Sequence, residues 1–109
     1  MVFGIERIKY LEENWKNIAL LVLNSARNLV DVKEAIVYGS VIKGRTMGSS
    51  DLDIALVIRN LDAKKLSELL IKIHLSLPED ISELVDLNLI DEKDEKEFLK
   101  FAGYYIILK

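Results

Sequence analysis

Two aspartates stand one residue apart at the start of an apolar segment, in the order Ser50-Asp51-Leu52-Asp53. Residues i and i+2 of a β-strand project from the same face of a sheet, so this spacing predicts two carboxylates side by side. Two such groups repel each other unless a cation lies between them. The pattern favours a metal site, and the alternative is an acidic strand end that faces water.

A third carboxylate, Asp86, interrupts the apolar segment 84–87. Burying an unpaired carboxylate is costly, so Asp86 needs either a solvent-exposed strand face or a bound cation. Asn88, on the same predicted face, supports the exposed face. If a neighbouring strand brings Asp86 to Asp51 and Asp53, the three acids can hold two divalent ions.

The composition limits which metal such a site could hold. The chain has 109 residues with no cysteine and one histidine, His74. Thiolate sites and histidine-rich zinc sites are therefore excluded. Oxygen ligands alone favour Mg²⁺ or Mn²⁺, of which we expect two ions.

A glycine-serine pair, Gly39-Ser40, directly follows a predicted strand, and Gly44 comes shortly after it. Glycine lets the backbone turn sharply and approach a phosphate closely, and Ser40 adds a hydroxyl. A short helix predicted over residues 41–47 would also present free N–H groups to an anion. Alone, this turn indicates phosphate binding only weakly.

Taken together, segment 39–44 (G-S-x-x-x-G) and, after five further residues, segment 50–53 (S-D-x-D) resemble the signature of the polymerase-β-like nucleotidyltransferases. The chain most resembles their minimal branch, the MntA-type antitoxins paired with a HEPN-domain toxin. The resemblance extends over essentially the whole chain. It implies a single minimal nucleotidyltransferase domain over residues 1–109, with a small mixed sheet of about four strands and helices packed against it.

The resemblance also implies a role for each motif residue. The implied residues that bind the nucleotide and its phosphates are Gly39, Ser40, Gly44 and Ser50. The implied catalytic and metal-binding residues are Asp51, Asp53 and Asp86. ATP is the implied substrate, and Asp86 would contact one metal ion and the acceptor hydroxyl.

One position departs from the family pattern. Many relatives carry arginine directly after the glycine-serine pair, and this chain has Val41 there. Lys43 and Arg45 are candidate replacements for that positive charge, and surface solubility explains both residues equally well.

The resemblance implies transfer of AMP from ATP to an acceptor hydroxyl, here a tyrosine of a partner HEPN toxin, with this chain as the antitoxin. Larger members of the superfamily carry extra domains that bind the acceptor, so we expect another molecule to supply it. Two alternatives stay open. One is an antitoxin that neutralises its partner by contact alone, and the other is a transferase acting on small molecules.

Hydrophobic periodicity predicts the elements that must position these residues. The predicted helices span residues 5–30, 62–77 and 91–102. The predicted strands span residues 34–39, 50–58, 83–90 and 104–108. The order alternates helix and strand, which predicts an α/β or α+β sandwich, with Asp62 and Asp91 as helix N-caps and Gly103 after the last helix.

Charge and hydropathy exclude some classes of protein. The formal charge of −3 argues against a dedicated nucleic-acid binder. The longest apolar run, residues 18–23, is too short to span a bilayer. It predicts deep burial against the sheet, and the alternative is a face for homo-oligomer formation. The amino terminus lacks the pattern of a signal peptide, so we expect a cytoplasmic protein.

Overall fold

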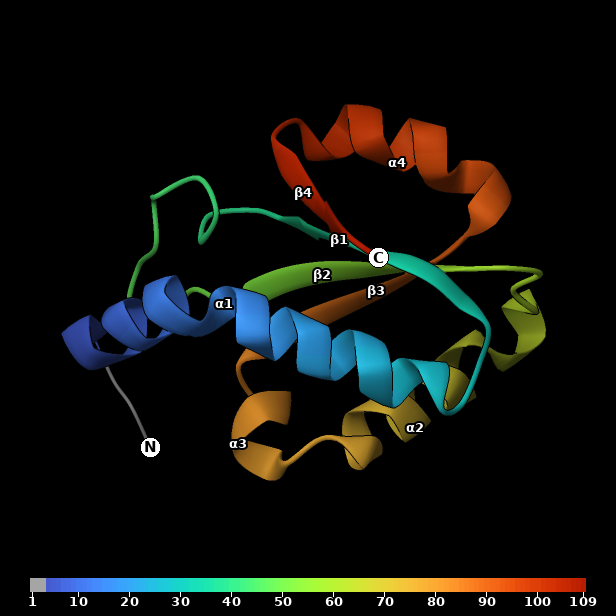
Figure 1. Cartoon of the computed structure of the whole chain (residues 1–109), viewed down its shortest axis with the longest axis horizontal. Helices are drawn as coiled ribbons and strands as arrows, with labels where there is room; N and C mark the ends of the chain where they lie inside the picture. Colours follow the sequence, from blue (N-terminus) through green and yellow to red (C-terminus); the bar gives the residue numbers. More distant parts are fainter. Residues whose placement is uncertain (1–3) are drawn as a thin grey trace.

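The computed structural model describes residues 4–109 as a four-stranded sheet with helices on both faces (Figure 1). The helices are α1 (Gly4–Arg27), α2 (Leu66–Ser76), α3 (Glu79–Ser82) and α4 (Glu95–Ala102). The strands are β1 (Val32–Tyr38), β2 (Leu52–Ile58), β3 (Val85–Asp91) and β4 (Tyr105–Leu108). The predicted fold class, a mixed α/β fold of about four strands, is confirmed.

The strands lie in the order β3-β2-β1-β4. β1 pairs antiparallel with both β2 and β4, whereas β2 pairs parallel with β3. A parallel pair needs a long crossover connection, and α2 and α3 supply it. This crossover places the beginnings of β2 and β3 at the same end of the sheet.

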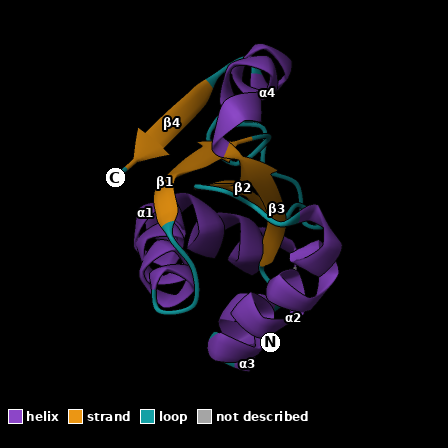
Figure 2. Cartoon of the chain, turned by 90° about the vertical axis from the view of Figure 1, so that its right-hand side faces the viewer, coloured by secondary structure: helices purple, strands orange, loops and turns teal. Residues whose placement is uncertain are grey.

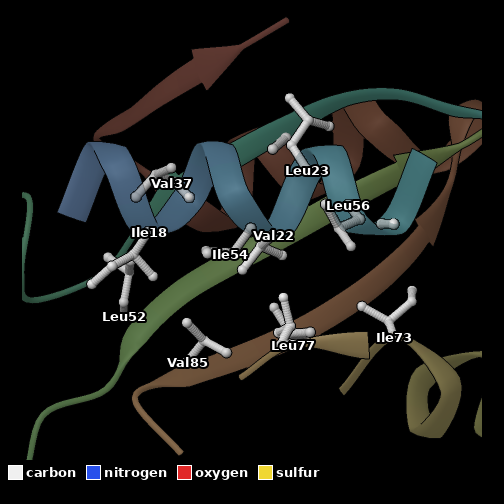
Figure 3. Close-up of a cluster of buried hydrophobic side chains, with 14 of the residues drawn as sticks. Ile18, Val22, Leu23, Val37, Leu52, Ile54, Leu56, Ile73, Leu77 and Val85 are labelled. Atoms are coloured by element: carbon white, nitrogen blue, oxygen red, sulfur yellow. The ribbon is translucent and has the colours of Figure 1, made fainter. Parts of the chain in front are cut away.

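The two faces of the sheet are covered differently. Helices α1, α2 and α3 lie on one side, and α4 lies on the other (Figure 2). The larger core, drawn in Figure 3, joins α1 and α2 to the side chains of Ile54 and Leu56. Ala55 and Val57 point the opposite way and pack with Phe98 of α4. Side chains of β2 therefore alternate between the two cores, and β2 is buried on both faces.

The apolar run in α1 is buried against the sheet. Ile18, Ala19, Val22 and Leu23 are each at most 3% exposed. Their burial confirms the predicted core role of these four residues, whereas Leu21 of the same run is 39% exposed. No helix within residues 4–109 combines the length and the hydropathy needed to cross a membrane.

The segment after the glycine-serine pair differs from the prediction, because residues 41–47 form turns instead of a helix. The N–H of Gly44 donates to the carbonyl of Val41 at 3.2 Å, and the N–H of Arg45 donates to that of Ser40 at 2.9 Å. Gly44 has a φ of +71°, which ends any right-handed helical path. The segment after Ser40 therefore supplies no helix N-terminus to the predicted phosphate site.

Several element boundaries also differ. The first helix ends at Arg27, earlier than predicted, and Pro78 is followed by the short helix α3, which the sequence analysis missed. Proline ends α2 as expected, but it also suits the start of a new helical turn. Asp62 and Asp91 do act as caps, each accepting a backbone hydrogen bond two residues on, although each begins a short 3-10 turn.

A buried acid pair far from the aspartates joins β1 to α4. Glu34 is 4% exposed and Glu95 is 9% exposed. Burial raises the pKa of Glu34, and its hydrogen bond and charge interaction with Glu95 raise it further. The hydrogen bond to Glu34 lowers the pKa of Glu95, and the hydrogen bond that Glu95 accepts from Lys33 Nζ at 2.9 Å lowers it further.

We expect Glu34→Gln to stabilise the protein at pH 7 by about 1 kcal/mol, the size of one net hydrogen bond. The raised pKa of Glu34 means that its stabilising contribution is complete in acid and is lost as pH rises through the folded-state pKa. Glutamine keeps a donor for Glu95 at every pH. Urea unfolding at pH 4 and pH 7 tests this, with exposed Glu12→Gln as the control. A gain of equal size at both pH values would contradict the explanation.

Candidate active site

Four polar side chains form a row across one end of the sheet. Tyr105 pairs with Tyr38, Tyr38 pairs with Asp53, and Asp53 pairs with Asp86. Because directly paired residues of neighbouring strands point to the same face, all four lie on the α4 side. The structure thus brings Asp86 to the strand position next to Asp53.

Asp53 and Asp86 interact strongly. Burial raises the pKa of Asp53 to about 6, and the charge of Asp86 is the next cause, followed by the charge of Asp51 and a hydrogen bond to Asp86. Lys43 opposes the shift. Asp86 itself is exposed to solvent, as one of the two interpretations of its strand face required. A half-buried acid next to a second acid is the arrangement that a bound cation stabilises.

The backbone of Gly39 lies directly against the Asp53 carboxylate. Its φ of +86° is one that side chains rarely tolerate. A Cβ built at Gly39 would overlap Oδ2 of Asp53 and lie 2.9 Å from its Cγ. The glycine is therefore needed for the approach of the backbone to the Asp53 carboxylate, a role that the sequence analysis did not assign. Its predicted phosphate contact stays a prediction.

Hydrogen bonds to Ser50 hold together the two ends of the loop between β1 and β2. Ser40 Oγ donates to Ser50 Oγ at 3.1 Å, and Ser50 Oγ accepts from the backbone N–H of Met47 at 2.9 Å. In this arrangement Ser40 and Ser50 shape the loop. Thr46 Oγ1 is buried there without a hydrogen-bond partner among the described residues, which leaves one polar atom of the loop for a ligand or water.

The Asp51 carboxylate forms an ion pair with Arg7 of α1. Arg7 Nη2 of α1 donates to Asp51 Oδ1 at 2.8 Å, and Arg7 Nε donates to the carbonyl of Ser50 at 3.2 Å. Within residues 4–109, no three acidic or histidine side chains lie close enough together to hold one metal ion. The structure therefore brings Asp53 and Asp86 together and holds Asp51 against α1.

Tyr38 is a site residue that the sequence analysis missed. Asn88 Nδ2 donates to Tyr38 Oη at 3.4 Å. Burial raises the pKa of the Tyr38 hydroxyl, and the charges of Asp53 and Asp86 raise it further. The tyrosine ring packs edge-on against Phe98 of α4. Tyr38 thus holds a neutral hydroxyl beside the acid pair.

Two cations, Lys43 and Arg45, follow the glycine-serine turn, and the charge of Lys43 acts on Asp53. A shallow depression is lined by Ile42, Lys43, Arg45 and Tyr104. Neither Lys43 nor Arg45 forms an ion pair with another described residue. Tyr104 is 58% exposed, whereas its neighbour Tyr105 anchors β4 to β1. This depression offers positive charge and an aromatic surface to an anionic ligand.

The residues present fit a divalent cation. Asp53 and Asp86 supply carboxylate oxygens, the ligands that Mg²⁺ and Mn²⁺ prefer. Neither has a cationic side chain within 4.0 Å among the described residues. Both would ligate the ion, and Asp51 would join them only after its carboxylate leaves Arg7.

Comparisons with known proteins identify the family and the fold of the chain. The model of the family described as polymerase beta, nucleotidyltransferase matches residues 21–103, which include the glycine-serine turn and all three aspartates. No curated protein matches the sequence significantly. A crystal structure from Sulfolobus solfataricus, titled as a "putative nucleotidyltransferase", is similar in fold, with a TM-score of 0.61 and 18% identity over 94% of this chain and 83% of the other. This chain belongs to the polymerase β nucleotidyltransferase family.

Proposed function

We propose that this chain is a metal-dependent nucleotidyltransferase that moves a nucleoside monophosphate, AMP from ATP, to an acceptor hydroxyl. Family membership supports nucleotidyl transfer in general. The observation that carries the rest is the pairing of Asp53 with Asp86 beneath the turn at Gly39. Two carboxylates next to a glycine turn suit the binding of a cation together with a triphosphate.

The reaction forms one bond and breaks another. The acceptor oxygen bonds to the α-phosphorus of ATP, the bond from that phosphorus to the pyrophosphate oxygen breaks, and the acceptor proton is lost to a base. Bound divalent ions would neutralise the triphosphate and the leaving pyrophosphate. Asp86, which is exposed, would hold the acceptor hydroxyl and accept its proton. Lys43 and Arg45 would attract the pyrophosphate side of the nucleotide.

The acceptor in this proposal is a tyrosine of a HEPN-domain toxin, and the chain is its antitoxin. The similarity of the glycine-serine and aspartate motifs to the MntA-type branch supports this assignment. The test is incubation of the purified chain with α-labelled ATP, Mg²⁺ and the product of the neighbouring gene. Label on a tyrosine of that product is expected. Label confined to small molecules would replace the protein acceptor with a small one.

Magnesium and ATP together should raise the melting temperature, while ATP with excess chelator should change it little. The charges of Asp53 and Asp86 repel a triphosphate unless a cation is present. Binding to the folded state stabilises it by about 2.7 kcal/mol at a hundredfold excess over Kd. A thermal-melt series with ATP, Mg²⁺ and chelator measures this. Full stabilisation by ATP in excess chelator would contradict the metal requirement.

A further inference from the structure

We infer that Arg7 is a built-in competitor for the divalent ion, because it occupies Asp51 and must release it when the ion binds. This inference rests on the proposed function. Arg7 would thereby lower the affinity of the site for the ion, and metal binding would affect the start of α1.

The contacts of Arg7 carry the inference. One guanidinium donates both to Asp51 Oδ1, at 2.8 Å, and to the carbonyl of Ser50, at 3.2 Å. The Arg7 side chain is only 16% exposed, whereas that of Asp51 is 47% exposed. Arg7 is therefore held by its surroundings, and the Asp51 carboxylate is the more accessible partner. A divalent ion from solvent could therefore reach the Asp51 carboxylate while Arg7 is bound to it.

The three aspartates differ in how their charge is balanced. Asp51 alone among them has a cationic partner within 4.0 Å in the described part of the chain. Asp53 and Asp86 have no such partner in that part of the chain, although the charge of Lys43 acts on Asp53 from farther away. A divalent ion bound at this pair would attract Asp51, and Arg7 would then lose its carboxylate acceptor and keep only the carbonyl of Ser50. The ion and Arg7 thus compete for the same carboxylate.

This competition has a consequence for α1. Arg7 lies at the end of the first turn of that helix, and its two hydrogen bonds join the helix to the loop that carries the acids. If an ion weakens these bonds, the bonds must weaken ion binding to the same extent. The first turns of α1 should therefore loosen when the ion binds.

The test measures the affinity for Mn²⁺ without nucleotide, by following the free ion with electron paramagnetic resonance. Arg7→Gln should bind Mn²⁺ about two- to fivefold more tightly than wild type, the range expected for loss of one partly exposed ion pair. Arg59→Gln is the matched control, because Arg59 pairs with Asp31 at the same distance of 2.8 Å. Its affinity should equal that of wild type.

Hydrogen exchange supplies an independent measurement. Mn²⁺ should speed exchange in the first turns of α1 in wild type and leave Arg7→Gln unchanged there. Arg7→Lys, which keeps the charge, replaces Arg7→Gln if circular dichroism shows that the glutamine variant is unfolded. Lysine has one donor group and should give an intermediate affinity.

The outcomes separate this inference from the proposed function. Equal or weaker Mn²⁺ binding by Arg7→Gln would overturn the inference, since Arg7 would then only orient Asp51. Wild-type protein that binds no Mn²⁺, with or without ATP, would overturn the proposed function itself.

Discussion

Asparagine at position 53 should lower nucleotidyl transfer about a thousandfold or more while the protein stays folded. The change keeps the size of the side chain but removes one charge from the pair that Asp53 forms with Asp86. Positioned metal charge supplies a large part of the rate in reactions of this kind. Transfer of label to the partner, with and without the substitution, measures the effect.

The same substitution should stabilise the metal-free protein at pH 7. The pKa of Asp53 is raised to about 6, chiefly by burial and by Asp86. The folded state therefore holds a proton that the unfolded state releases, and stability falls as pH rises from about 4 to 6. Asp53→Asn removes this fall. Because Asp53 is half-buried and water screens it, we expect a gain of about 1 kcal/mol.

Urea unfolding at pH 3.5 and pH 7 in chelator measures this gain, and exposed Asp80→Asn is the control. A matching loss of toxin neutralisation in cells that co-express the partner would support catalysis. Full protection by Asp53→Asn with an unmodified partner would instead support an antitoxin that acts by contact alone.

Alanine at Gly39 should be the most destabilising of the simple glycine substitutions, at about 2–4 kcal/mol. Its cost has two sources, the φ of +86° and the overlap of the new methyl group with the Asp53 carboxylate. Gly103 is the matched control, since its φ of +71° is similar and its surroundings within 4 Å are open. Gly103→Ala should cost less, about 1–2 kcal/mol, from the backbone angle alone.

Gly39→Ala should also weaken Mn²⁺ binding at least tenfold, because the displaced Asp53 carboxylate can no longer meet Asp86. Urea unfolding and Mn²⁺ titration of both alanine variants measure the two effects. Equal destabilisation by Gly39→Ala and Gly103→Ala would show that the backbone angle alone matters, and that Gly39 does not set the position of Asp53.

The elements were predictable where a local pattern decides them. The apolar segment within residues 50–58 predicted a strand, and Asp62 and Asp91 predicted where helical turns begin. The helix expected over residues 41–47 was wrong because Gly44 adopts a positive φ and the loop folds around Ser50. Such side-chain contacts within a loop leave no periodic signal in a sequence.

The site was predictable only in part. The i, i+2 spacing suggested that Asp51 and Asp53 act together, but β2 begins at Leu52, and Asp51 turns to Arg7. That contact joins residues 44 positions apart, which no local pattern reveals. Tyr38 was not predicted as a site residue for the same reason, since only the pairing of β1 with β2 places it beside the acids.

The most direct test of the account is a crystal structure of the protein with Mn²⁺ and a non-hydrolysable ATP analogue, using anomalous scattering to locate the ion. The account predicts an anomalous peak between the carboxylates of Asp53 and Asp86, with the triphosphate against the turn at Gly39 and Ser40. An ion and nucleotide bound elsewhere, with Asp53 and Asp86 in contact with neither, would contradict it.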